Sequence, residues 1–244
     1  NGDGTLTYTP DPGHVGPDSF SYTVTDGELT DTATVTVRTN APPSVIASDD
    51  FADGALGAPW TFVGPTGTDQ AIATTATESF LALITPEGAH SLWGSENGAA
   101  RAMQNVTNGD LEVEARFLST PTERFQQQGI LVEEDALNWI RFETYSDGST
   151  LYAFAASTAD GASSARLKVA IPEGAAPYLR VARVEDDWTL SYSSDGETWV
   201  EAGSFTHVLD LSAIGPYAAS TEGSGGYTAT VDYFESLSDP IADE

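Results

Sequence analysis

Aromatic and charged residues share one face of a predicted β-hairpin at 127–145. Its strands, 127–133 and 139–145, are joined by a short acidic turn. Because side chains alternate along a strand, Ile140 and Phe142 point to one face. The opposite face carries Trp139, Arg141, Glu143 and Tyr145. Such a face offers rings that can stack on sugars and planar polar groups that can bind hydroxyls, although charge pairs and aromatics also occur on sheets that bind nothing.

The chain carries a strong negative charge. Its 244 residues include 37 Asp and Glu against 9 Lys and Arg, which gives a net charge of −28, and Lys168 is the only lysine. This balance argues against nucleic acid, whose binding is dominated by Lys and Arg contacts to phosphate, and against anionic membrane surfaces. Self-repulsion is tolerated best where salt or divalent cations screen it, so we expect an extracellular or cell-surface location in a marine or high-salt setting.

Cysteine is absent, which excludes disulfides and thiolate metal sites. No run approaches the roughly 18 apolar residues of a membrane span, and no signal peptide opens the chain. We therefore expect no membrane insertion. The opening Asn1-Gly-Asp-Gly is typical of a turn inside a domain, so we expect the chain to be a fragment of a longer protein.

Residues 1–40 predict three strands, at 5–9, 18–25 and 30–38, from alternating Thr, Val, Tyr and Phe. The Asp26-Gly pair between the last two is a strong tight-hairpin signal. Three strands are too few to close a sandwich, and their unpaired edge invites pairing. We expect the edge to be covered by the large domain, by a neighbouring chain, or by residues outside this sequence.

The same residues carry a family resemblance. Asn1-Gly-Asp-Gly-Thr-Leu-Thr-Tyr, Gly16-Pro-Asp-Ser-Phe-Ser-Tyr-Thr-Val-Thr-Asp-Gly and Asp31-Thr-Ala-Thr-Val-Thr-Val occur in this order. They resemble the second half of the bacterial cadherin-like, Ig-like tandem repeats of surface adhesins and extracellular enzymes. The resemblance implies a partial Ig-like domain over 1–40, whose first half would be supplied from elsewhere.

A Pro-rich linker at 41–47 separates this segment from a second domain at 48–237. Short strand patterns recur throughout that domain, separated by Gly, Asp and Ser turns, and no segment shows a helical period over ten residues. The pattern predicts an all-β fold, a two-sheet antiparallel sandwich. Residues 238–244 form an acidic tail or the start of a further linker.

The second domain also has a characteristic order of motifs. They are Asp49-Asp-Phe, His90-Ser-Leu-Trp-Gly, Asn138-Trp-Ile-Arg-Phe-Glu, Trp188-Thr-Leu-Ser-Tyr-Ser-Ser-Asp-Gly and Val231-Asp-Tyr-Phe. Their order resembles the concanavalin A-like jelly-roll domains appended to bacterial β-xylosidases and a related family of extracellular modules. The resemblance implies a jelly-roll sandwich associated with carbohydrate, often as a non-catalytic part of a larger enzyme or adhesin.

The resemblance also places residues 90–104 near the open face of the central hairpin. The candidate ligand-binding residues are then His90, Trp93, Arg101, Gln104, Gln127, Trp139, Arg141, Glu143 and Tyr145. Because the arginine fork binds paired hydroxyls or a carboxylate bidentately, two arginines raise the hypothesis of a glycan with an anionic group, such as a uronic acid. The alternative is that Arg101 and Arg141 only pair with nearby glutamates to balance charge.

Catalysis has weaker support than binding. A glycosidase needs two carboxyl groups about 5.5 to 9.5 Å apart. Glu112 and Glu114 have no aromatic residues nearby, and Glu143 has no acidic partner two positions away. A polysaccharide lyase would need a Tyr or His base beside cationic neutralisers, which His90, Tyr145 and the arginines could supply. We expect a non-catalytic module.

Calcium is the one cofactor with some support. Hard cations take carboxylates and backbone carbonyls from loops. Asp49 and Asp50 open the sandwich, and Asp232 lies near its end. The first and last strands pair in domains of the kind resembled, so a structural Ca²⁺ could clamp these ends. The alternative is ordinary turn chemistry of Asp in an acidic protein.

The sequence thus predicts a non-catalytic carbohydrate-binding module of a large secreted or cell-surface bacterial protein, either an adhesin or a multidomain glycan-active enzyme. The competing hypothesis is a structural or assembly module of an extracellular fibre or surface layer, in which a neighbouring chain completes the N-terminal half-domain. A polysaccharide lyase or glycosidase is a third hypothesis.

Overall fold

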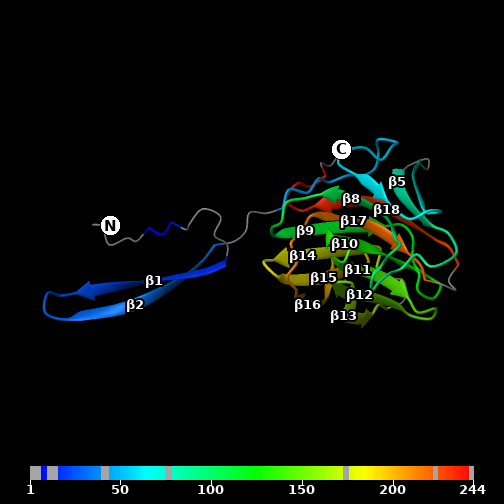
Figure 1. Ribbon diagram of the computed structural model, residues 1–244. Coiled ribbons are helices and arrows are strands. Elements are labelled where there is room, and N and C mark those ends of the chain that lie inside the picture. The colour runs from blue at the N-terminus through cyan, green and yellow to red at the C-terminus, as the bar shows by residue number, and fades with distance from the viewer. Residues whose placement is uncertain are drawn as a thin grey trace. The chain divides into compact units, whose positions relative to one another are not determined.

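The computed structural model describes residues 7–9, 16–39, 44–74, 79–172, 176–221 and 225–241. All of its named elements are β-strands, as the sequence predicted. Among the described residues, none belongs to a helix long and apolar enough to cross a membrane. The chain divides into two compact units, Asn1–Pro42 and Pro43–Glu244 (Figure 1). The division falls inside the segment predicted as the linker.

The first unit contains a hairpin of β1 (Gly16–Thr25) and β2 (Thr30–Thr39). Its turn is held by Asp26, whose carboxylate accepts hydrogen bonds from the backbone N–H groups of Glu28 and Leu29 at 2.9 and 2.8 Å. These bonds favour the ionised carboxylate and lower the pKa of Asp26. The Asp26-Gly turn therefore joins the two strands in the hairpin that the sequence predicted.

The predicted strand at 5–9 is not a strand where it is described, at residues 7–9, and its first two residues lie outside the described part of the chain. Tyr8 instead stacks its ring on Phe20, with 6.1 Å between centroids. Along the hairpin, Tyr22 and Val24 are exposed. The expectation that another part of the protein or a neighbouring chain covers the edge of this small sheet stays a prediction.

The described part of the second unit contains two antiparallel sheets of seven strands each, which confirms the predicted sandwich. The first sheet contains, in spatial order, β13 (Ala162–Ala170), β12 (Leu151–Ala159), β11 (Asn138–Ser146), β10 (Gln127–Asp135), β17 (Ala213–Ala219), β8 (Ala100–Asn105) and β3 (Thr61–Val63). The second sheet contains β16 (Trp199–Thr206), β15 (Asp187–Ser193), β14 (Tyr178–Val184), β9 (Leu111–Phe117), β18 (Tyr227–Ser236), β5 (Ser79–Thr85) and β4 (Asp69–Thr74). β4 carries little strand signal in the sequence, because Ile72 is its single large apolar residue.

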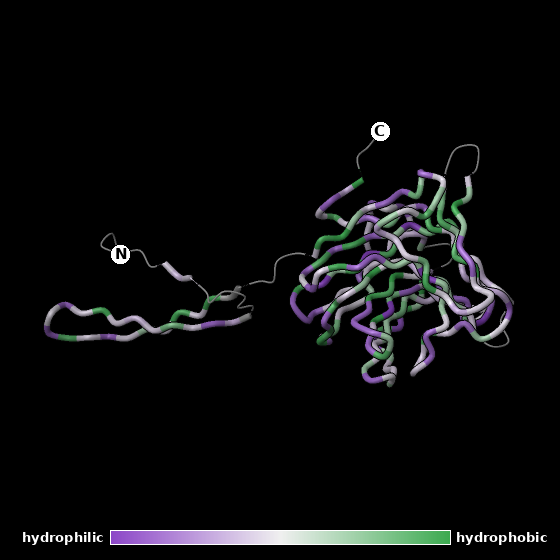
Figure 2. Tube along the Cα trace, turned by 45° about the horizontal axis from the view of Figure 1, so that its top comes forward, coloured by the Kyte–Doolittle hydropathy of each residue, from purple (hydrophilic) through white to green (hydrophobic). Residues whose placement is uncertain are grey.

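The main core lies between the inner faces of these sheets. In β9, Val113, Ala115 and Phe117 are buried in it. Phe142 of the first sheet meets Trp188 of the second, with ring centroids 5.7 Å apart. Hydrophobic and hydrophilic residues alternate along the chain in Figure 2. Burial of each large apolar side chain contributes about 1.5–3 kcal/mol, so this layer supplies most of the folding energy.

A second layer of apolar packing covers part of the outer face of the first sheet. A short hairpin of β6 (Leu92–Trp93) and β7 (Glu96–Asn97) lies there. Leu92 joins a buried cluster that includes Trp139 and Tyr217. A separate cluster on the sheet contains Tyr145, Phe154 and Ala156. The outer face is therefore packed at one end and hollow beside it.

Candidate functional site

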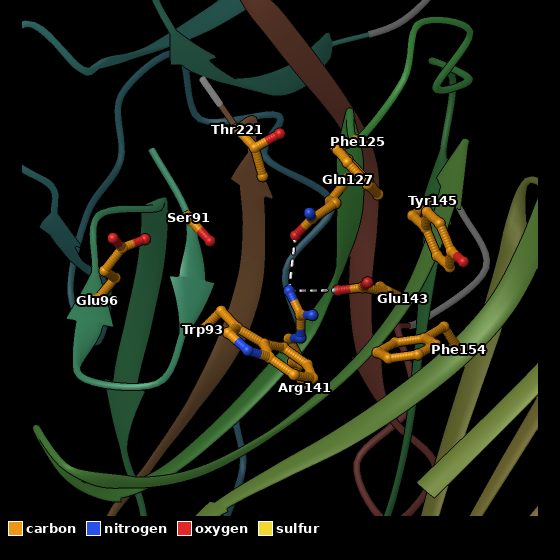
Figure 3. Close-up of a pocket in the computed structure, with 10 residues that line it drawn as sticks. All are labelled: Ser91, Trp93, Glu96, Phe125, Gln127, Arg141, Glu143, Tyr145, Phe154 and Thr221. Carbon is orange, nitrogen blue, oxygen red and sulfur yellow. Dashed lines mark hydrogen bonds and ion pairs between the residues drawn. The ribbon is translucent and has the colours of Figure 1, made fainter. Parts of the chain in front are cut away.

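A pocket of about 390 Å³ opens on the outer face of the first sheet. Five of the residues predicted from sequence line it: Trp93, Gln127, Arg141, Glu143 and Tyr145. Five others were not predicted: Ser91, Glu96, Phe125, Phe154 and Thr221. In Figure 3, Ser91 and Glu96 lie on one side of the pocket, and Tyr145 and Phe154 lie on the other. Trp93 and Arg141 lie next to each other between them.

Arg141 forms the centre of the pocket floor. Its Nη1 donates a hydrogen bond of 2.8 Å to Oε1 of Gln127 and lies 3.5 Å from Oε2 of Glu143 (Figure 3). Its Cζ lies 5.2 Å from the ring centroid of Trp93 and 5.3 Å from that of Phe154. A guanidinium between two aromatic rings is held by cation–π attraction as well as by its ion pair. The side chain is therefore fixed in place before any ligand arrives.

Glu143 depends on a glycine for its position. In the register of the sheet, Gly129 of β10 faces Glu143 on one side and Tyr217 on the other. Because Gly129 has no side chain, the Tyr217 hydroxyl reaches across the strand and donates a hydrogen bond to Oε2 of Glu143. A Cβ on Gly129 would lie 2.0 Å from the carbonyl oxygen of Phe142, so no other residue fits there. The backbone thus creates the gap that the Glu143–Tyr217 contact crosses.

Burial dominates the ionisation of this pair. It raises the pKa of Glu143, and the ion pair with Arg141 and the hydrogen bond from Tyr217 oppose the rise. Burial beside the carboxylate also raises the pKa of Tyr217. The Tyr217 hydroxyl therefore keeps its proton and acts as a donor to Glu143.

Trp93 supplies the exposed aromatic surface of the pocket. Its neighbour Leu92 is fully buried against the sheet, while Trp93 is 44% exposed. The backbone of the hairpin is closed at its base by a hydrogen bond of 2.8 Å from Gly98 N–H to the Ser91 carbonyl. A large indole left open to water in this way is free to make contact with a ligand.

The opposite wall is aromatic as well. The Tyr145 ring packs edge to face against Phe154, with centroids 5.3 Å apart, and stacks on Tyr152 at 5.2 Å. Lys168 lies over this stack, with its Nζ 4.2 Å from the Tyr152 centroid. A hydrogen bond with Tyr145 is the main reason that the pKa of Lys168 is raised, so the side chain is charged at neutral pH. This wall combines rings with a hydrogen-bond donor.

Trp139 is the clearest correction to the predicted site. The sequence assigned it to an open platform, on the same face as Arg141, and the face is right. The β6–β7 hairpin covers that part of the face, however, and Trp139 is 0% exposed. Trp139 therefore cannot stack on a ligand, and the prediction of an indole platform at this position is wrong.

The side chains of three further predicted residues are absent from the pocket lining and hold other structure. Arg101 pairs with Glu133, with its Nε 3.1 Å from Oε1, which matches the charge-balance alternative. Gln104 accepts a hydrogen bond from Ala47 N–H at 2.8 Å and donates one to its carbonyl at 2.9 Å. His90 is buried, and its backbone bridges to Ser220. None of the three lines the pocket.

The carboxylates expected to hold calcium have protein partners. Asp49 accepts hydrogen bonds of 2.7 Å from the Trp60 indole and from Phe51 N–H. Asp232 pairs with Arg116 at 2.7 Å, and Asp50 accepts a bond from Ala52 N–H at 3.0 Å. Among the residues with described positions, no group of three or more His, Cys, Asp or Glu is arranged to hold a metal ion. The beginning and the end of the sandwich do pair, through a bridge from Asp49 to Phe234. The binding of calcium stays a prediction.

The lining residues that were not predicted differ in whether the sequence carries a signal for them. Phe154 lies on β12, on the same face as Tyr152 and Ala156. The alternation of side chains along this strand therefore could have predicted that Phe154 lies near Tyr145. Phe125 precedes β10 in a left-handed backbone conformation, φ 62°, and its N–H donates to the Ser146 carbonyl. Ser91 and Thr221 have no sequence signal, because only the tertiary fold brings them together.

The comparisons with known proteins agree with this architecture. The chain belongs to the family described as "Protein of unknown function (DUF1349)", whose model matches residues 89–238. A model described as "Bacterial Ig domain" matches residues 1–38, which confirms the Ig-like resemblance of the first unit. No curated protein matches the sequence.

Solved structures share the sandwich at low sequence identity. The GH43 BlXynB protein from Bacillus licheniformis has a TM-score of 0.63 at 17% identity, over 77% of this chain and 38% of that one. Xylan beta-1,4-xylosidase from Bacillus halodurans C-125 gives 0.58 at 17%, over the same shares. A glycoside hydrolase family 16 endo-glucanase from Bacteroides ovatus gives 0.54 at 12%, over 79% of this chain and 100% of that one. This chain therefore spans well under half of the first two proteins, and the likeness establishes the fold.

Truncation of Trp139 and of Trp93 should lower the free energy of unfolding by different amounts. We expect Trp139→Ala to lower the free energy of unfolding by about 3–5 kcal/mol, because it leaves a cavity under the hairpin. Trp93→Ala should cost less than about 1 kcal/mol, mainly the cation–π contact with Arg141. Urea unfolding of both variants measures the difference, and equal costs would contradict the assignment of one tryptophan to packing and the other to the pocket.

Glu143 should make stability depend on pH. Its folded pKa lies above its usual value of 4.5, so the folded chain retains a proton that the unfolded chain has already released. Stability should therefore fall as pH rises from that usual value through the folded pKa. Glu143→Gln removes this titration, and its stability relative to the native chain should rise across the same window. Urea midpoints over the pH series test this with exposed Glu201→Gln as control, and an opposite trend would mean that Arg141 and Tyr217 outweigh burial.

Proposed function

We propose that the second unit is a non-catalytic module that binds a saccharide in the pocket between Trp93 and Tyr145. One observation carries the proposal. The half-exposed Trp93 indole opens onto a floor of polar groups, Arg141, Gln127 and Glu143, that are themselves buried and held by one another. Apolar rings at the rim and fixed polar groups at the base are the two features that a sugar site requires.

The polar groups suit hydroxyl recognition. Gln127 accepts a hydrogen bond from Arg141 through its carbonyl oxygen, which orients the amide nitrogen as a donor. Glu143 offers carboxylate oxygen, and Arg141 is rigid enough to present its fork without losing further side-chain entropy. Because these groups are fixed in advance, binding costs less ordering than at a flexible surface. The pocket volume of about 390 Å³ falls within the usual range for small-molecule sites.

The balance of charge in the pocket favours a neutral saccharide over an acidic one. The hypothesis of an anionic ligand rested on two arginines at one face, but Arg101 pairs with Glu133 outside the pocket. Arg141 is offset by Glu143, and Glu96 adds a second carboxylate to the lining. A uronic acid would therefore meet two carboxylates and one guanidinium in the lining. Neutral sugars avoid this repulsion.

Binding without cleavage also fits the acidic groups. Glu143 is engaged by Arg141 and Tyr217 at the floor, while Glu96 belongs to the exposed hairpin. A glycosidase holds two carboxyl groups on either side of the scissile bond. An engaged carboxylate at the floor serves better as an acceptor for hydroxyls than as a nucleophile or acid.

Folds of this kind accompany glycan chemistry in the proteins compared, two of which are named as a GH43 protein and a xylan beta-1,4-xylosidase. Carried over to this chain, that association supports a role beside a catalytic or adhesive partner in a larger extracellular protein. A single base-sized stack contributes about 1–3 kcal/mol in other systems. One site of this size reaches a micromolar to millimolar Kd, which suits a module that works by avidity.

Binding to a glycan array, followed by titration of the bound sugar, tests the proposal. Trp93→Ala should weaken binding by about tenfold or more, since it removes the stacking surface. Arg141→Lys should also weaken it, because an ammonium cannot reproduce the fork or its place between two rings. Val184→Ala, an exposed apolar residue on the second sheet, is the matched control.

The competing assembly role gives a different outcome in the same experiment. An array with no bound glycan, together with self-association that increases with concentration in analytical ultracentrifugation, would contradict a saccharide site. New absorbance from unsaturated ends on incubation with uronic-acid polymers would instead identify a lyase and overturn the non-catalytic assignment.

A further inference from the structure

The β6–β7 hairpin closes one end of the hollow on the first sheet. It crosses the outer face and is fixed at the turn between β12 and β13, where Gly94 N–H donates a hydrogen bond of 2.7 Å to Ser163 Oγ. The Ser163 hydroxyl is itself 2.7 Å from that of Thr158. A Cβ on Gly94 would lie 3.7 Å from the Gly161 carbonyl oxygen, so the two turns are in contact distance. The hairpin is therefore anchored at its tip as well as at its base.

The space beneath the hairpin is filled. Leu92 packs there with Met103, Leu131 and Trp139, all of them buried. Directly beside this packing, Trp93 and Glu96 turn toward the pocket as its lining. A saccharide cannot continue along the strands past this point, because the hairpin and the cluster under it occupy the path.

A second side of the pocket is closed by backbone. His90 N–H donates to the Ser220 carbonyl at 2.8 Å, and Ser220 N–H donates to the His90 carbonyl at 3.2 Å. The next residue after each, Ser91 and Thr221, lines the pocket. This backbone bridge borders the pocket at the β17 side. A chain that crossed the strands from β12 would stop against it.

Across the strands from this bridge, the rings of Tyr145 and Phe154 border the pocket, and β12 and β13 lie beyond Tyr145. Tyr145 lines the pocket and stacks on Tyr152, and Lys168 lies over Tyr152. Lys168 is exposed on β13, the edge strand of the first sheet. The aromatic rings thus run from the pocket toward the edge of the sheet, with the Lys168 ammonium over the last ring.

We propose that the pocket receives the end of a glycan chain, and that the following sugar units leave over Tyr152 and Lys168. The inference rests on the proposed saccharide binding and adds to it the ligand class, a chain terminus in place of an internal segment. The hairpin blocks one end of the path along the strands, and the His90–Ser220 bridge blocks one end of the path across them. A chain can therefore enter the pocket but cannot run straight through it. The surface of Tyr152 and Lys168 is then a second subsite, outside the residues that line the pocket.

The number of protein-binding sites per milligram of polymer tests whether the pocket binds chain ends. Soluble xylan, mixed-linkage β-glucan and polygalacturonate serve as probes, each before and after limited digestion by its own endo-acting hydrolase. Binding to chain ends predicts that the amount of protein bound at saturation, per milligram of polymer, rises in proportion to the ends created. An amount that stays constant per milligram or falls on digestion would overturn end recognition.

A variant in the second subsite gives an independent readout. With the oligosaccharides released from whichever polymer binds, Tyr152→Ala should weaken binding of the trisaccharide by about tenfold, because the ring that stacks on Tyr145 and holds Lys168 in place is lost. Ser164→Ala, exposed on the same edge strand as Lys168, is the control and should bind as the native chain does. An unchanged trisaccharide affinity in Tyr152→Ala would contradict the exit path. A native chain that binds none of the three polymers and no glycan on the array would instead refute the proposed function itself.

Discussion

Two opposite charges are buried on a sheet face that is ordinarily open to water, and the site depends on how they are compensated. Arg141 and Glu143 are both almost fully buried on the outer side of the first sheet. Taking such groups out of water costs several kcal/mol each unless good geometry and further hydrogen bonds offset the loss. Gln127, Tyr217 and two aromatic rings provide that geometry here. A set of groups held this tightly is preorganised, which is what a weak-binding saccharide site needs most.

The β6–β7 hairpin converts this face into a pocket. With Leu92 as its apolar anchor, it buries Trp139 and leaves Trp93 at the rim. The same short element thus removes one indole from solvent, exposes another, and ends the groove. The rings of Tyr145 and Phe154 lie on the other side of the pocket (Figure 3), and Tyr152 stacks on Tyr145. Specificity in such a site comes from shape and blocked directions as much as from individual contacts.

The alternation of residues in the sequence predicted the sandwich and the composition of the site face correctly. Ile140 and Phe142 are in the core, and Arg141, Glu143 and Tyr145 share the opposite side, because a period of two leaves only one solution in a half-buried strand. Trp139 shows the limit of that reasoning. Alternation predicts which face of the sheet a side chain lies on. Whether water reaches Trp139 on that face depends on the hairpin of residues 92–97, whose two short strands pair with each other. Gly129 is a further example, since its role appears only when Glu143 and Tyr217 are seen on either side of it.

The central claim is that a saccharide end lies between Trp93 and Tyr145 on the first sheet. A crystal structure of the chain with an oligosaccharide captured from the array tests it most directly. We expect the terminal sugar to stack on Trp93, with hydroxyls within hydrogen-bond distance of Gln127 and Arg141 and the second unit over Tyr152. Sugar density on the second sheet, for example beside Trp199 and Arg180, or a chain that runs through the pocket in both directions, would contradict the account.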